Sequence, residues 1–68
     1  MKFKIEIAPA EDGRWVAEVV ELPGVLARGW TPEQARARVQ AFALRVVADR
    51  LEHGEADPGL SNISFFAA

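Results

Sequence analysis

Cysteine is absent from the 68 residues of this chain, and histidine occurs once, at position 53. Without cysteine the chain has neither a disulfide nor a thiolate metal site, and one imidazole cannot form a metal cage without a cluster of carboxylates around it. No apolar run is long enough to span a membrane, and the alternating opening Met1-Lys2-Phe3-Lys4 is unlike a signal peptide. We therefore expect a cytoplasmic protein with no metal and no cofactor.

The small size of the chain limits its core. A core built from 68 residues barely offsets the conformational entropy of ordering them, and natural domains of this size usually add a disulfide, a metal or a second copy of themselves. The first two are excluded here. Half of the residues are apolar, which suggests that another subunit covers some apolar surface. We expect a homodimer or a larger homo-oligomer.

A large excess of positive or negative charge is also lacking. The formal net charge is −2, so the chain does not have the large excess of lysine and arginine on which non-specific nucleic-acid binding depends. The arginines of the expected helix are interleaved with acids, and Arg45 and Asp49 are spaced for an i, i+4 ion pair. This pattern favours a solvated face of mixed charge. We expect neither nucleic acid nor a membrane as a direct partner.

Strand and turn signals fill the first half of the chain. Residues 2–8 alternate between apolar and charged side chains, which predicts a half-buried strand. A loop closed by Gly13 leads to a second strand over 14–20, and the two form an antiparallel hairpin. Residues 21–24 place Pro and then Gly at the centre of a predicted type II turn. A short third strand follows over 25–28.

The clearest local signal is a helix start. Thr31 can cap the first turn, Pro32 suits the first helical position, and Gln34 can complete a capping box. The helix then runs to about Glu52, with Gly54 placed for a left-handed cap. A last strand is expected over 61–66.

The resulting order is β-β-β-α-β in a single domain that spans residues 1–68. The helix is long enough for a crossover, so the last strand can lie parallel to a central one. We predict an α+β fold, a two-layer α/β sandwich with one helix on one face of the sheet.

Two apolar stripes run along the predicted helix. The stripe expected to cover the sheet comprises Ala35, Val39, Phe42 and Val46, widened by Ala43 and Val47. The second stripe lies on nearly the opposite side and comprises Ala37, Ala41, Leu44, Ala48 and Leu51. Two interpretations stay open for it: a self-association surface between helices of two subunits, or alanines chosen for helix propensity with two scattered exposed leucines.

No catalytic constellation is present. Serine occurs only late in the chain, and His53 lies near a helix end, where histidine usually caps carbonyl groups. Four acids cluster around the first hairpin: Glu11, Asp12, Glu18 and Glu21. Adjacent acids in a turn are common for backbone hydrogen-bonding reasons, so they do not indicate a metal or a shared proton. We expect a protein that is not an enzyme.

Trp30 has two interpretations. It precedes the helix cap, where an apolar side chain can staple onto Ala35 in the first turn. Alternatively it is an exposed anchor for a partner, because tryptophan is enriched at binding hot spots.

The chain resembles the HicB-like antitoxin family over almost its whole length. The family pattern is an acidic-Gly turn, an aromatic-x-Ala strand, a Leu-Pro-Gly turn and a Gly-Asp-Thr helix start. The matching segments, in the same order, are residues 11–18 (EDGRWVAE), 21–24 (ELPG) and 29–35 (GWTPEQA). The resemblance implies a partial ribonuclease-H-like fold and oligomers, and members paired with a HicA-type toxin, a small basic RNA-cleaving protein, block it.

The leading hypothesis is therefore a stand-alone antitoxin-type module, in a toxin–antitoxin system, that occludes such a toxin. Its expected partner-binding residues are Glu11, Asp12, Glu18, Glu21 and Trp30. Three features depart from the family: Trp30 replaces an Asp, Val25 replaces a small residue or Cys, and no DNA-binding segment follows the last strand. The alternative hypothesis is an orphan homo-oligomeric module that binds a small ligand or another protein, and an RNA-binding domain comes third.

Overall fold

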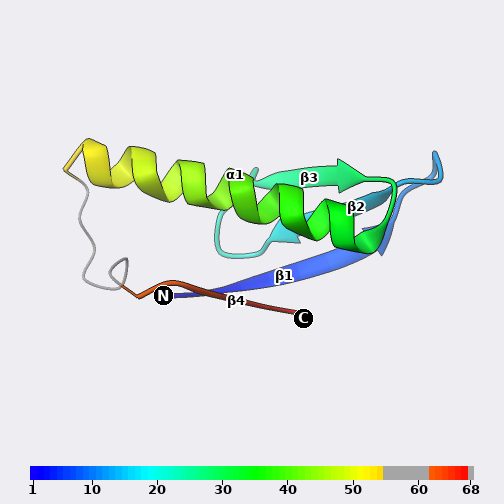
Figure 1. Ribbon diagram of the computed structural model, residues 1–68, viewed down its shortest axis with the longest axis horizontal. Helices are drawn as coiled ribbons and strands as arrows, with labels where there is room; N and C mark the ends of the chain where they lie inside the picture. The colour runs from blue at the N-terminus through cyan, green and yellow to red at the C-terminus, as the bar shows by residue number, and fades with distance from the viewer. Residues whose placement is uncertain (55–61, 68) are drawn as a thin grey trace.

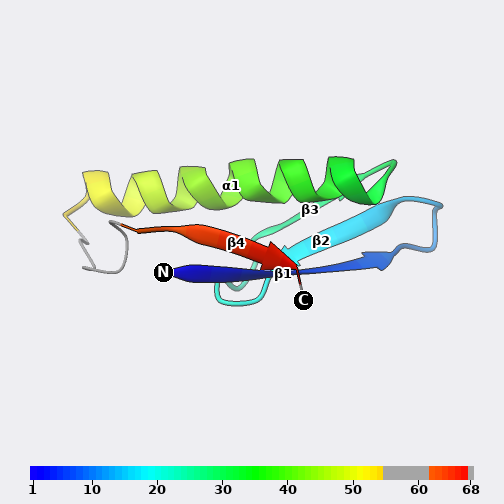
Figure 2. The same ribbon diagram turned by 60° about the horizontal axis from the view of Figure 1, so that its bottom comes forward.

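A four-stranded mixed sheet carries one long helix on one of its faces (Figures 1 and 2). The computed structural model describes residues 1–54 and 62–67. Its elements are β1 (Lys2–Pro9), β2 (Trp15–Val19), β3 (Leu26–Gly29), α1 (Pro32–Glu52) and β4 (Ser64–Ala67). The strand order is β3-β2-β1-β4, antiparallel except that β4 runs parallel to β1. The predicted α+β class and β-β-β-α-β order are confirmed.

The two predicted turns position the sheet. In the first hairpin, Gly13 has a φ of +83° and the register pairs Pro9 with Trp15. In the second turn the Val25 N–H donates to the Leu22 carbonyl at 3.0 Å, and Gly24 has a φ of +85°, a value at which a side chain would be strained. Proline and glycine therefore occupy the positions that their conformational preferences require.

The core lies between the sheet and α1. From the sheet it receives Phe3, Ile5, Ala17 and Val19, and from the second turn Leu22 and Val25. The fully covered side of α1 is an i, i+4 ridge made of Ala35, Val39, Ala43 and Val47. Phe42 and Val46, placed by the sequence at the centre of this side, are only partly buried at its edge. The ridge of smaller residues faces the sheet because it lets the helix backbone approach the sheet closely.

The junction between β3 and α1 is unusually close. A Cβ atom on Gly29 would lie 2.5 Å from the backbone nitrogen of Ala35. Beside it, Arg38 Nη1 donates to the carbonyl of Arg28 at 2.9 Å and so occupies an outward-facing group of the sheet edge. The start of the helix is thus held against the end of β3.

Strand β4 is shorter than expected. The sequence predicted a strand over 61–66, but β4 starts at Ser64, whose N–H donates to the Met1 carbonyl at 2.9 Å, and it extends to Ala67. Ser61 lies outside the described residues. The start of β4 matches its partner strand, because β1 begins at Lys2 and Lys2 aligns with Ser64. Phe65 then packs on Phe3 with ring centroids 5.5 Å apart.

Candidate partner-binding surface

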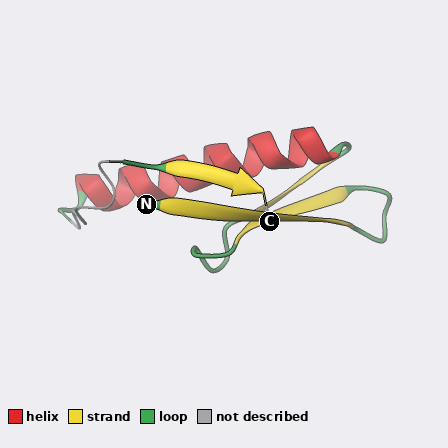
Figure 3. Ribbon diagram, turned by 90° about the horizontal axis from the view of Figure 1, so that it is seen from below, coloured by secondary structure: helices red, strands yellow, loops and turns green. Residues whose placement is uncertain are grey.

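The sheet face opposite α1 is covered by no element that the structure describes (Figure 3). Alternate side chains of each strand project from it, opposite in parity to the buried residues of the core. We call this surface the open face. Along β1 and β4 it carries Lys2, Lys4, Glu6, Ala8, Ser64 and Phe66. Along β2, β3 and the residues next to their ends it carries Arg14, Val16, Glu18, Val20, Leu26, Arg28 and Trp30.

Large apolar side chains are exposed on the open face. The described residues include seven exposed large hydrophobic side chains, and four of these lie there: Val20, Leu26, Trp30 and Phe66. Two more, Leu44 and Leu51, lie on the outer side of α1. Exposed apolar groups that gather on one face are typical of an interaction surface, whereas scattered ones are ordinary.

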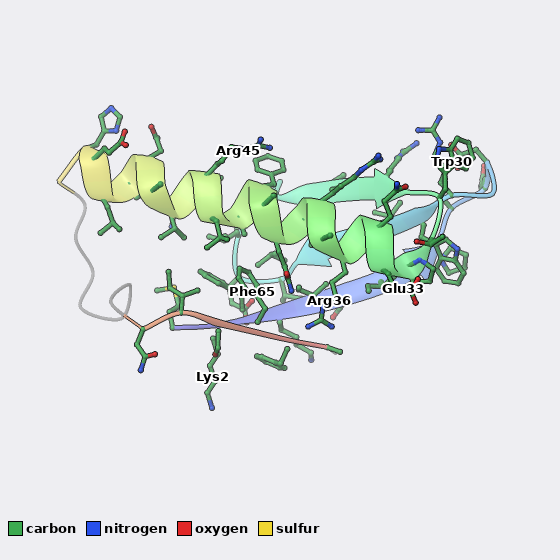
Figure 4. The ribbon with its side chains drawn as sticks, viewed as in Figure 1. Lys2, Trp30, Glu33, Arg36, Arg45 and Phe65 are labelled. Atoms are coloured by element: carbon green, nitrogen blue, oxygen red, sulfur yellow. The ribbon has the colours of Figure 1, made fainter. Side chains whose placement is uncertain are left out.

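Trp30 is the most exposed of these side chains, at 61%. Its backbone N–H donates to Gln34 Oε1 at 2.7 Å, and Thr31 Oγ1 accepts from the Gln34 N–H at 3.0 Å. The capping box therefore forms, except that the glutamine reaches the residue before the cap. Figure 4 shows Trp30 at the end of the molecule where α1 begins, beside the β1–β2 hairpin.

The Trp30 ring packs on an arginine. The guanidinium of Arg14 lies 4.7 Å from the ring centroid, and the two residues come one step beyond the Trp15–Gly29 pair that ends the β2–β3 ladder. The Trp30 side chain is 61% exposed, whereas Ala35, its expected staple partner, is fully buried in the core cluster. The contact favours the anchor interpretation of Trp30 over the staple.

Asp12 positions that arginine. Its Oδ1 accepts from the Arg14 backbone N–H at 3.1 Å, while Oδ2 lies 3.3 Å from Arg14 Nε and 3.7 Å from Arg28 Nη1. Arg14 Nε is within ion-pair distance but is not aligned for a hydrogen bond. An open depression of about 330 Å³ lies beside this cluster, lined by Ala10, Glu11, Asp12 and Arg28. Asp12 is thus largely neutralised by its own chain.

The four acids predicted to bind a partner do not form one cluster. Glu11 is exposed at the hairpin tip, and Asp12 is engaged as described. Glu18 lies three residue pairs along the hairpin from the Pro9–Trp15 pair, roughly 10 Å at the usual rise of a strand. Glu21 lies beyond the end of β2, where its Oε1 accepts from the Lys4 backbone N–H at 2.9 Å.

Glu21 therefore completes the β1–β2 ladder, and its loss should affect stability before binding. We expect Glu21→Ala to lower the free energy of unfolding by about 1 kcal/mol, because the Lys4 N–H loses a charged acceptor. Glu21→Gln keeps an acceptor oxygen and should lose less than half of that. Urea unfolding of the two variants checks the assignment. A Glu21→Ala protein as stable as the wild type would return Glu21 to the binding residues.

Sequence reasoning did not include Glu6, Arg14 and Arg28 among the partner-binding residues. Glu6 lies directly opposite Glu18 on the open face, and like charges in opposite positions are unfavourable in a sheet. The signal was available in the hairpin register, since a short loop after Pro9 fixes which residues face each other. The roles of Arg14 and Arg28 depend on which residues of the neighbouring strands lie beside them, and only the structure shows those neighbours.

The predicted self-association stripe lies where the sequence placed it. Ala37, Ala41, Leu44, Ala48 and Leu51 are all exposed, and no described residue covers them. One neighbouring prediction was wrong: Arg45 does not pair with Asp49. Its guanidinium lies 5.9 Å from the Phe42 ring centroid, while Asp49 Oδ1 is 3.4 Å from His53 Nδ1.

His53 contacts the end of the helix, as expected for a histidine in that position. Its Nδ1 lies 2.7 Å from the Asp49 carbonyl oxygen, and Gly54 follows with a φ of +75°. Within residues 1–54 and 62–67, no three His, Asp or Glu side chains are grouped so that they could hold a metal ion. None of the described helices has the length and apolar character needed to cross a membrane.

Comparisons with known proteins add no relative. No protein-family model matches the sequence, and searches of curated proteins and of solved structures found no match either. The function must therefore be inferred from the chain's own residues. The arrangement that they form is an open sheet face with an exposed Trp–Arg pair at one end.

Proposed function

We propose that this chain is a cytoplasmic protein-binding module of the HicB-like antitoxin type. It neutralises a small basic RNA-cleaving toxin by covering the surface with which the toxin holds RNA. The location of the contact is inferred from Trp30, which is 61% exposed and stacked on Arg14 at one end of the open face. The class of partner rests on the sequence resemblance.

The Trp30–Arg14 pair has the properties of a binding hot spot. Tryptophan and arginine dominate measured hot spots because they desolvate large areas and combine apolar with polar contact. Trp30 is also held in place before binding, with its backbone N–H bonded to Gln34 and its ring against Arg14. A side chain that is already ordered loses little conformational entropy when a partner covers it.

Exposed acids at the hairpin tip and in the middle of the open face supply electrostatic attraction for a basic partner. Glu6, Glu11 and Glu18 are exposed and take part in none of the ion pairs of the described residues. Exposed charges of this kind act mainly on the rate of association and are screened by salt. We expect the rate constant for association with a basic toxin to fall as salt concentration rises, with Glu11→Gln and Glu18→Gln weakening that dependence.

Co-expression with the product of the adjacent gene tests the proposal. A small basic protein from that gene should arrest growth alone, lose its toxicity when this chain is present, and co-purify with it. Leu51→Ala, on the outer side of α1, is the matched control for Trp30→Ala, because both remove an exposed apolar side chain. If the neighbouring protein is harmless alone and does not co-purify, the antitoxin proposal fails.

The second candidate is an orphan homo-oligomeric module that binds a small ligand or another protein. It is favoured by the presence of two exposed apolar surfaces, the open face and the stripe on α1, in a chain with a small core. A chain that self-associates and binds no basic partner would distinguish this candidate from the antitoxin.

A further inference from the structure

We propose that the open face binds the same face of a second copy of this chain, through a two-fold axis that crosses the strands between Glu6 and Lys4. The inference does not depend on the antitoxin proposal. The proposed interface is a different surface from the stripe on α1. The inference rests on how charged and apolar side chains are distributed over the open face.

The charges on the open face lie in separate rows. Glu6 of β1 pairs with Glu18 of β2, so two acids lie side by side in the middle of the face. Lys4 occupies the next row, opposite Val20, whose N–H donates to the Lys4 carbonyl at 3.0 Å. Lys2 lies in the row after that. None of these four charged side chains takes part in the ion pairs of the described residues.

A two-fold axis between the acid row and the Lys4 row makes the face complementary to itself. The axis turns β1 of one copy antiparallel over β1 of the other, so Lys4 of each copy faces Glu6 of its partner and lies beside the partner's Glu18. The unfavourable Glu6–Glu18 neighbours then share a cation. An axis parallel to the strands would instead place acids on acids. Charge therefore selects the first arrangement.

Apolar side chains surround the same axis. Val20 and Phe66 share the Lys4 row, and Leu26 shares the acid row, and all three are exposed in the single chain. Sheets that pack face to face bury such side chains at a spacing of about 10 Å. The sheet edge at β3 is a poorer contact, because Arg38 already occupies the Arg28 carbonyl there.

The second copy leaves the Trp30 end uncovered. Trp30 and Arg14 lie two rows from the acid row, on the side away from the lysines. The partner's β1, which spans Lys2–Pro9, does not reach that far along the face. Self-association and a contact at Trp30 are therefore compatible. The open face is about 19 Å wide, at about 4.8 Å per strand.

Charge reversal on each half of the complementary pair tests the arrangement. One variant carries Lys2→Glu and Lys4→Glu, and the other carries Glu6→Lys and Glu18→Lys. Each should dissociate into monomers in sedimentation velocity, with self-association weakened roughly tenfold or more, because like charges then face each other. An equimolar mixture should form a heterodimer at least as tight as the wild-type homodimer. Circular dichroism checks that both variants are folded.

Two controls separate an effect of the open face from an effect of net charge or of the helix stripe. The first control is Arg45→Glu with Arg50→Glu, which changes the net charge by the same amount as the lysine variant but at positions on α1. This control should bind the Glu6→Lys, Glu18→Lys protein more weakly than the lysine variant does. Leu44→Glu on the helix stripe should leave the dimer intact. The proposal is overturned if the wild-type chain stays monomeric at several hundred micromolar, or if the folded charge-reversal variants assemble as the wild type does. It is also overturned if the equimolar mixture stays monomeric, or if Leu44→Glu alone dissociates the dimer.

Discussion

Replacing Gly29 by alanine is expected to destabilise the fold by about 3 kcal/mol, the upper part of the usual range for overpacking. The new Cβ atom would lie 2.5 Å from the Ala35 nitrogen and 2.9 Å from the Gln34 carbonyl carbon. Both are backbone atoms of the first helical turn, so no side-chain rotation relieves the clash. The helix must move away from β3, and the buried ridge that begins at Ala35 moves with it.

Gly24→Ala is the matched control for this prediction. Gly24 has a φ of +85° and an added Cβ there meets nothing within 4 Å, so its substitution strains the backbone without a clash. That strain should cost about 1–2 kcal/mol. Urea unfolding followed by circular dichroism compares the two variants. Equal stability of Gly29→Ala and the wild type would show that the helix does not start against β3 as described.

Replacing Trp30 by alanine is expected to weaken partner binding by at least about 30-fold, which corresponds to about 2 kcal/mol. The ring is 61% exposed and its described ring contact is the Arg14 guanidinium, so its removal takes little from the core. We expect the free energy of unfolding to change by less than about 0.5 kcal/mol, as for ordinary surface substitutions.

The two readouts distinguish an anchor from a staple. An anchor loses affinity while the fold is unchanged, whereas a staple loses stability and binding together. Isothermal titration with the basic partner gives the first quantity and urea unfolding gives the second. Trp30→Phe should recover part of the affinity, because a smaller ring still stacks on Arg14. A Trp30→Ala protein that binds as the wild type does would exclude Trp30 from the contact.

Local signals in the sequence predicted the fold because each depends on only a few neighbouring residues. Gly24 takes a positive φ because of its place in a four-residue turn, and Thr31 accepts from Gln34 because of helix-start geometry. The hairpin register follows from a short loop. These features together determine the element order, and a crossover of this length places the helix on one face.

Features that depend on distant residues could not be predicted in the same way. Leu22 and Val25 belong to the core although they flank a turn, because both side chains join the buried cluster that the sheet and α1 form. Asp12 was expected to face a partner, but Arg28 arrives beside it from β3 and helps to neutralise it. The helix ridge was misplaced by about one residue step, since periodicity alone does not show how closely two layers approach.

The central claim is that a protein partner covers the Trp30 end of the open face. The chain contains two tryptophans, and the second, Trp15, lies on the side of the sheet that packs against the core. Nuclear magnetic resonance of the two indole Nε1–H groups in a titration with the basic partner therefore carries its own control. We expect the Trp30 signal to shift strongly while the Trp15 signal changes little. A complex that forms with the Trp30 signal unchanged would contradict the claim.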